Sequence, residues 1–302
     1  MTHPARILSP AGLAIGGVVV CALIWGTTWY AITLQLGVVD PTVSVVWRFG
    51  LSALVMFGFC LVTRRPVRMN RNQHLAALGQ GAFVFAASYG FVYAAEERVA
   101  SAVVAVMFAA LAFLNLAMFR IVVGQKASRA AWGGALCGVM GVAVLSGGEI
   151  VAAGMDRTAL TGVAFALIAT FSSTVGNYFA WRGQQAQAPI ATATAWAMGY
   201  GTGMLALYGL LTGVEWRIET DLSYLLALLY LALFGSVIAF GLYFSIARLK
   251  GYATASYISA LTPPIAMLVS VLFEGARFGL SAFLGLALVL AGQLLLIRSP
   301  QA

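Results

Sequence analysis

The stretch from residue 253 to residue 274 reads ATASYISALTPPIAMLVSVLFE, and it decides how the chain is interpreted. Its length suits a membrane-spanning helix, which needs roughly 20 apolar residues, but Pro263 and Pro264 interrupt it near the middle. A proline pair removes two backbone donors and bends a helix, which lipid tolerates only where neighbouring helices or a cavity satisfy the freed carbonyls. We therefore predict a bent transmembrane helix beside a pathway, with Pro263 and Pro264 as a conformational hinge.

The composition of the whole chain indicates a membrane protein. Of its 302 residues, 62% are hydrophobic and only 9% are charged, whereas soluble domains carry about 25% charged residues. A net charge of +8 would suggest nucleic-acid binding in a soluble protein, but in a membrane protein it reflects cytoplasmic loops. We expect a lipid bilayer as the surroundings, no nucleic-acid partner, and buried thiols rather than disulfides at the three cysteines.

Ten apolar runs are long enough to cross a bilayer, so the predicted fold is an all-α integral membrane protein. The connections are short and no phosphate-binding GxxxxGK[ST] sequence occurs, which excludes an ATP-driven pump within this chain. The first run follows Arg6 and is interpreted as a retained helix rather than a cleaved signal peptide. The predicted spans cover residues 11–35, 41–62, 74–95, 100–122, 130–147, 159–181, 189–212, 222–246, 253–273 and 279–297.

Charged residues orient these spans. With a cytoplasmic N-terminus, the inner segments carry only cations, whereas every acidic residue falls in an outer segment. Positive charge in short cytoplasmic loops is the known determinant of orientation, so both termini are predicted to be cytoplasmic. The inner cations are Arg6, Arg64, Arg65, Arg68, Arg71, Arg120, Lys126, Arg129, Arg182, Arg248, Lys250 and Arg298. The outer acids are Asp40, Glu96, Glu97, Glu149, Asp156, Glu215, Glu219, Asp221 and Glu274, beside Arg98, Arg157, Arg217 and Arg277.

A shift by about half the chain indicates an internal repeat. It pairs Gly90 with Gly241, Gly134 with Gly285, and Gly141 with Gly292. Glycines are common in this chain, so chance identity is the alternative. Five spans in each half would give the halves opposite orientations in the membrane. We predict two inverted five-helix repeats, residues 1–150 and 151–302, with a substrate site between them.

Several short motifs then resemble a known family. Trp25-Gly26-Thr27-Thr28-Trp29, Trp47-Arg48-Phe49, Ala100-Ser101-Ala102, Gly124-Gln125-Lys126 and Ser259-Ala260-Leu261-Thr262-Pro263 are similar, in order and spacing, to EamA-type exporters of the drug/metabolite transporter superfamily. The resemblance covers nearly the whole chain and extends to exporters of aromatic amino acids. It implies a ten-helix transporter of the bacterial inner membrane that exports amino acids or related small metabolites from a central cavity.

The sequence departs from the family at one frequent motif. Gly-Glu commonly follows the fourth and ninth helices of these proteins. Here the first unit has Gly124-Gln125, and the second has Glu274-Gly275 in reversed order. The role of the family's carboxylates therefore cannot be transferred to this chain.

The residues inside the predicted spans exclude several kinds of chemistry. His3 and His74 lie at a tail and a span edge, so no metal site or serine–histidine hydrolase is expected. No Asp or Glu lies in the middle of a span, so no buried carboxylate of the proton-relay type is expected either. We predict that the chain is not an enzyme and needs no cofactor.

Arg48 is the one charged residue well inside a predicted span. An intramembrane arginine is a candidate for binding a substrate carboxylate. The alternative is a structural role, in which the guanidinium bonds to neighbouring helices or reaches toward the membrane surface. Both interpretations stay open at this point.

Aromatic and polar side chains at helical spacing form the remaining candidate site. Such residues commonly pack against other helices or lipid, but buried polar tips need partners that a cavity could supply. An apolar wall with few polar groups suits neutral or aromatic amino acids. With Arg48, the predicted substrate-binding residues are Trp25, Thr28, Tyr89, Tyr93, Asn177, Tyr178, Tyr243, Tyr257 and Ser259.

Two functions remain. The first is a secondary transporter that works by alternating access on a small-molecule substrate, and the second is a non-transporting membrane sensor or scaffold with a ligand-binding cavity. The fourth span, residues 100–122, corresponds to the ninth span in the repeat but has no proline. We therefore predict that it is straighter than the ninth span. Oligomeric state is not predicted.

Overall fold

The computed structural model describes the backbone of residues 10–37, 39–152 and 156–298, and the side chains of these residues except 10–15, 149, 152, 250–254, 256, 257, 260 and 296–298. Within the described part the secondary structure is entirely helical, as predicted. The α-helices are α1 (Pro10–Thr33), α2 (Pro41–Val62), α3 (Arg71–Gln80), α4 (Tyr89–Glu96), α5 (Ser101–Phe108), α6 (Leu111–Met118), α7 (Arg129–Ala152), α8 (Arg157–Gln185), α9 (Ile190–Thr212), α10 (Leu222–Ala232), α11 (Ala239–Val269) and α12 (Leu280–Arg298). Four π-helical segments are η1 (Gly81–Ser88), η2 (Phe119–Val123), η3 (Leu233–Ile238) and η4 (Ser270–Glu274).

Seven helices in the described ranges are long and apolar enough to cross a membrane. They include composite spans: α3, η1 and α4 form one continuous run, and α5, α6 and η2 together form another span that is interrupted by a short turn at Ala109 and Ala110. Two shorter apolar helices, Leu261–Glu274 and Leu280–Leu295, accompany them. The chain is therefore a multi-pass membrane protein. The seven are Gly16–Thr33, Pro41–Val62, Arg71–Glu96, Ser101–Val123, Arg129–Gly148, Arg157–Gln185 and Leu222–Leu249.

Helix α11 doubles back on itself and supplies parts of two predicted spans. The ring of Tyr243 lies 5.4 Å from that of Trp25, and the next residue of α1, Gly26, is so close to Ile265 that an added Cβ would lie 2.4 Å from its side chain. Tyr243 and Ile265 would be about 33 Å apart along a straight helix. Both reach the same turn of α1, so the segment between them must turn back.

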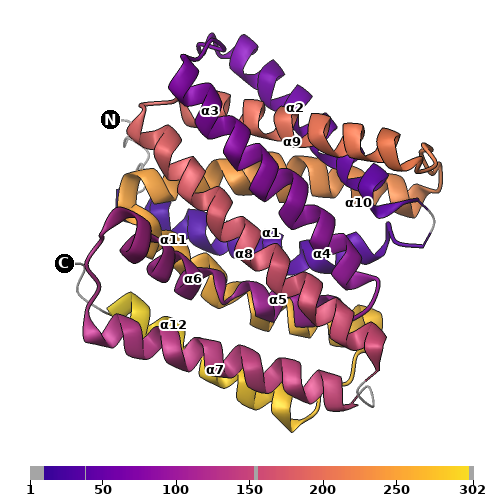
Figure 1. Cartoon of the computed structure of the whole chain (residues 1–302), viewed down its shortest axis with the longest axis vertical. Coiled ribbons are helices and arrows are strands. Elements are labelled where there is room, and N and C mark those ends of the chain that lie inside the picture. Colours follow the sequence, from indigo (N-terminus) through magenta and orange to yellow (C-terminus); the bar gives the residue numbers. More distant parts are fainter. Residues whose placement is uncertain (1–9, 38, 153–155, 299–302) are drawn as a thin grey trace, which may run out of the picture.

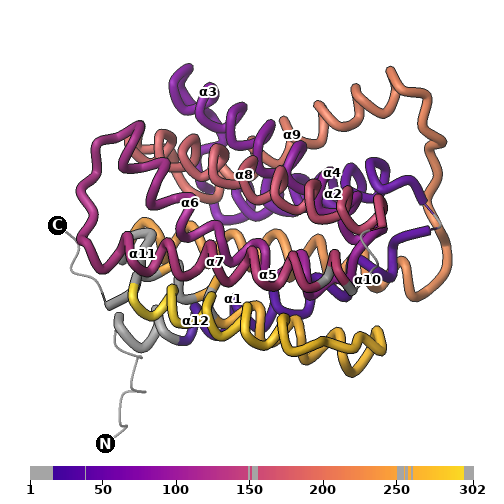
Figure 2. The backbone as a smooth tube through the Cα atoms, turned by 60° about the horizontal axis from the view of Figure 1, so that its bottom comes forward, coloured from indigo at the N-terminus to yellow at the C-terminus, as the bar shows by residue number. Residues whose placement is uncertain are grey.

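The helices pack as pairs around a central group (Figure 1). Helices α7 and α12 lie side by side along one edge of the bundle, and α2 and α9 lie along the opposite edge. Figures 1 and 2 place the start of α1 and the end of α12 at the same end of the bundle.

The contact between α7 and α12 is reciprocal. A Cβ on Gly141 would lie 2.6 Å from the carbonyl oxygen of Gly285, and a Cβ on Gly292 would lie 2.5 Å from that of Gly134. These are the same four glycines that the half-chain shift pairs in the sequence. Gly141 contacts Gly285, while Gly292, the repeat partner of Gly141, contacts Gly134, the repeat partner of Gly285. This reciprocal pattern is the one that a twofold axis produces.

Special backbone conformations also recur at an interval of about half the chain. Gly124 follows η2 with φ 77°, and Gly275 follows η4 with φ 66°. The next amide donates to the first carbonyl of each π-segment, from Gln125 to Phe119 and from Ala276 to Ser270, at 3.2 Å in both cases. The other described residues with positive φ also form pairs separated by about half the chain, Gly37 with Gln187 and Arg64 with Gly213.

The fourth span is not one unbroken helix, and its greater straightness relative to the ninth span stays a prediction. Helix α5 ends at Phe108, and a turn at Ala109 and Ala110 separates it from α6. The carbonyl of Ala109 accepts a hydrogen bond of 2.9 Å from Gln293 Nε2 of α12, which stabilises the break. Helix α11, by contrast, continues through Pro263 and Pro264 to Val269. An alanine pair gives no breaking signal in the sequence, because the partner lies 184 residues away.

Candidate functional site

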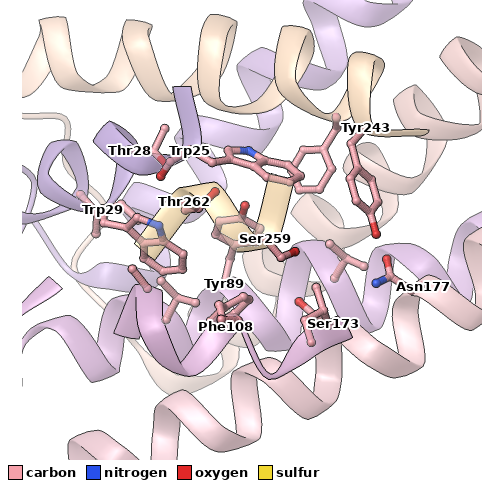
Figure 3. Close-up of a pocket in the computed structure, with 17 residues that line it drawn as sticks. Trp25, Thr28, Trp29, Tyr89, Phe108, Ser173, Asn177, Tyr243, Ser259 and Thr262 are labelled. Carbon is pink, nitrogen blue, oxygen red and sulfur yellow. The ribbon is translucent and has the colours of Figure 1, made fainter. Parts of the chain in front are cut away.

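A cavity of about 80 Å³ is lined by segments other than the outer helices α2, α7, α9 and α12, and Figure 3 shows it in close-up. Helices from both halves of the chain form its wall, and α11 contributes to it from both of its arms. The lining is Trp25, Thr28, Trp29, Ile32, Val84, Tyr89, Val92, Ala105, Phe108, Ala109, Leu111, Ser173, Asn177, Phe240, Tyr243, Ser259 and Thr262.

Aromatic rings form one wall of the cavity. The Trp25 ring packs against Phe240 at 5.2 Å and Tyr243 at 5.4 Å, while its Nε1 donates to the carbonyl of Gly235 at 3.1 Å. One turn later, the Trp29 ring lies 5.1 Å from Phe108. Its buried Nε1 has no protein acceptor, so this donor is free for a ligand or water in the cavity.

Polar groups gather near Asn177 on α8. Figure 3 shows the Tyr243 hydroxyl directed toward Asn177, and the two side chains interact. The Asn177 amide also donates to Asn115 Oδ1 at 3.4 Å, and Ser173 shares a hydrogen bond of 2.7 Å with Ser88. The cavity thus combines broad apolar surface with a few oriented hydrogen-bonding groups, which is the usual composition of a small-molecule site.

Six of the predicted site residues line this cavity. They come from α1, α4, α8 and both arms of α11, so segments that are distant in the sequence line one cavity. The six are Trp25, Thr28, Tyr89, Asn177, Tyr243 and Ser259.

Arg48 is buried behind the cavity wall rather than in it. Only 1% of the residue is exposed. Its Nε donates to Ser236 Oγ at 3.1 Å, and its guanidinium carbon lies 4.6 Å above the Tyr89 ring and 5.1 Å from that of Phe49. Since Ser236 lies in η3, Arg48 fastens α2 to η3 and supports the cavity residue Tyr89 from behind. Its Nη1 has no hydrogen-bond partner in the protein.

The other predicted residues lie elsewhere. Tyr93 is fully buried and donates its hydroxyl to Gln35 Oε1 at 2.8 Å. Tyr178 stacks on Trp181 at 6.0 Å and does not line the cavity. The side chain of Tyr257 lies outside the described residues. Pro263 and Pro264 follow directly after the cavity residue Thr262.

Comparison with known proteins identifies the family. Residues 12–147 and 160–298 each match the model of the EamA-like transporter family. The chain belongs to this family.

Two relatives and one solved structure extend the comparison of this EamA-like chain. It is 26% identical over 269 residues to the "Uncharacterized inner membrane transporter YedA" of Escherichia coli (strain K12), covering 88% of this chain and 85% of the relative. It is 22% identical over 279 residues to the "Probable amino-acid metabolite efflux pump" of the same organism, covering 89% and 90%. A crystal structure with 20% identity has the same fold, with a TM-score of 0.71 over 95% of this chain and 96% of that one.

Reasoning from the sequence missed several lining residues of the EamA-like cavity. Trp29 was not among the predicted site residues, and Phe108 lies in an apolar run without a polar marker. Ser173 belongs to the run Ser172-Ser173-Thr174, whose polarity within an apolar span was the available signal. Thr262 precedes the proline pair, and its hydroxyl donates to the carbonyl of Ile258 at 2.8 Å.

Glu96 also differs from expectation. It was placed in an outer loop, and a buried carboxylate was not expected. Helix α4 instead continues to Glu96, four residues after the cavity residue Val92, so Glu96 follows the same inward face. Only 7% of the residue is exposed, and neither carboxylate oxygen has a hydrogen-bond partner in the protein. Among the described residues, no group of three His, Cys, Asp or Glu side chains could hold a metal ion.

Proposed function

We propose that the chain is a secondary transporter of the bacterial inner membrane that exports amino acids or related small metabolites by alternating access. The observation that carries this proposal is the central cavity, because its walls come from both halves of the chain and it holds an unpartnered donor at Trp29. The names of the relatives support the same class: one is named an uncharacterized inner membrane transporter and another a probable amino-acid metabolite efflux pump.

The proposed topology has ten spans, both termini in the cytoplasm, and inverted repeats at residues 1–150 and 151–302. Three observations support it: the reciprocal glycine contacts of α7 and α12, the paired π-segments and positive φ values, and the two successive family matches. Inverted repeats provide two related conformations, each open to one side of the membrane. A substrate bound between the halves can therefore be released on either side.

The lining suggests the substrate. Rings of Trp25, Trp29, Phe108 and Phe240 offer apolar surface, while Ser173, Asn177, Tyr243 and Ser259 supply donors and acceptors. Neutral and aromatic amino acids match this mixture, because an apolar side chain fits the aromatic wall and a polar head group needs oriented partners. Aromatic amino acids are therefore the first candidate substrates.

Sealed liposomes containing the purified protein test the proposal. Loaded with labelled aromatic, branched, charged and small neutral amino acids, they are expected to release at least one class down its gradient without ATP. Liposomes without protein measure the passive leak. Comparison with the Asn177→Leu variant measures the part of the flux that depends on the polar end of the cavity. Binding of several solutes with no flux of any would support the sensor or scaffold function instead.

A further inference from the structure

One end of the cavity is closed by buried polar side chains. Ile32 and Val92 line the cavity, and Gln35 and Glu96 lie about one turn further along their segments. Gln35 lies just after α1, and Glu96 lies at the end of α4, where the start of α5 and the end of η4 also meet. This end is opposite the start of α1 and the end of α12. In the proposed topology this is the outer end.

Glu274 connects α5 with η4 at this closed end. Its Oε1 accepts a hydrogen bond from Ser101 Oγ, and its Oε2 accepts one of 2.7 Å from Ser270 Oγ. The carboxylate is thus satisfied by hydroxyl donors from two elements. Separation of α5 from η4 would break the bond to Ser101.

Glu96 lies near Glu274 but has no such donors. Glu274, which carries a like charge, and Arg48, which carries the opposite charge, both interact with Glu96. Arg48 does not form an ion pair with it, since the ion pair found among the described residues joins Arg98 to Glu97. A carboxylate that is nine-tenths buried, without a hydrogen bond and beside a second carboxylate, is strongly destabilised when ionised.

Among the described residues, the elements packed against α4 place no further cation on Glu96. Arg98 Nη1 donates to the carbonyl of Ala94 and to Glu97 instead. Helices α1 and α5 and the segment η1 have no charged residue, and the charged residue of α2 is Arg48. On α8, Arg157 is exposed at the first position and Arg182 lies near the opposite end. On α4 itself, the titratable neighbours Tyr89 and Tyr93 lie beside Arg48 and Glu96.

We infer that Glu96 is a proton-binding site that controls opening of the outer end of the cavity. A proton from the outer solution neutralises Glu96 beside Glu274 and stabilises the closed end. When α5 separates from η4, water reaches Glu96 and the proton returns to the outer solution. The sign follows from linkage: the closed form binds one more proton than the open form, so rising pH favours opening, by at most about tenfold per pH unit. This inference rests on the proposed function only in assigning this end of the cavity to the outer side of the membrane.

A cysteine reporter tests the inference without any substrate, so its outcome is independent of the flux assay. The reporter is Val92→Cys, in protein whose Cys21, Cys60 and Cys137 are replaced by alanine and which is held in lipid nanodiscs. Its rate of reaction with a membrane-impermeant maleimide is measured from pH 5.5 to 8 and divided by the rate at Thr220→Cys, an exposed position that corrects for thiol ionisation.

The corrected rate is expected to rise severalfold with pH when Glu96 is present, and to be independent of pH in Glu96→Gln. The matched control Glu97→Gln changes the exposed neighbouring carboxylate and is expected to keep the pH dependence. An unchanged pH profile in Glu96→Gln, a flat profile in the parent protein, or dependence on Na⁺ instead of pH would overturn the inference. If Glu96→Gln does not fold, infrared spectroscopy of the wild type at neutral pH decides: a protonated carboxylic-acid band supports the inference, and its absence overturns it.

Discussion

Replacement of Arg48 by alanine is expected to leave little folded protein. The substitution removes the guanidinium that bonds to Ser236 and packs over Tyr89, and it leaves a cavity inside the bundle. Loss of a large buried side chain costs roughly 3 kcal/mol or more, a large share of the stability of a typical protein. The fraction of monodisperse protein in detergent and its thermal unfolding temperature measure the effect.

Two further variants separate the structural role of Arg48 from substrate recognition. Methionine fills much of the same volume without a buried charge, so Arg48→Met is expected to fold and to transport. Lysine keeps the charge but not the planar group that packs on Tyr89, so Arg48→Lys is expected to be less stable than Arg48→Met. A well-folded Arg48→Met protein that no longer binds substrate would contradict the structural role.

Replacement of both Pro263 and Pro264 by alanine is expected to slow transport by about tenfold or more while stability is kept or increased. The prolines lack amide donors, so the carbonyls of Ser259 and Ala260 have no partner four residues later in α11. Alanines would supply both hydrogen bonds and stiffen the helix beside the cavity. An added bending cost of only about 1.4 kcal/mol gives a tenfold slower step.

The initial rate of flux per folded molecule measures this effect. Pro189→Ala is the matched control, because Pro189 is the N-cap residue of α9 and lies away from the cavity. The hinge hypothesis fails if the double variant inserts normally and transports at the wild-type rate.

The structure also shows which features a single sequence can predict. The membrane class depends on average hydrophobicity, and aromatic spacing along single helices brought out Trp25, Tyr89 and Tyr243, which the fold then places around one cavity. These signals are local, because each can be evaluated within one helix. The half-chain interval between paired glycines was also visible in the sequence, since glycines mark close helix contacts.

The features that could not be predicted depend on contacts between distant segments. The break after Phe108 is stabilised by Gln293, and no residue close to Ala109 in the sequence indicates this contact. The position of Arg48 behind the wall depends on Ser236, 188 residues away. Burial of Glu96 depends on how far α4 extends, and helix ends are the least certain part of a sequence-based assignment.

The central claim is that one cavity is exposed alternately to the two sides of the membrane. A cysteine at Ser259, in protein without Cys21, Cys60 and Cys137, measures this directly, because Ser259 lines the cavity. Sealed vesicles of known orientation are treated from one side at a time with an impermeant thiol reagent. Arg71→Cys and Thr220→Cys, which are exposed in predicted inner and outer connections, report the side.

With alternating access, the cysteine at position 259 is expected to react from both sides, and a transported amino acid is expected to slow both reactions. Each side control is expected to react from its own side only. Reaction of position 259 from a single side, unchanged by any amino acid that the protein binds, would contradict alternating access.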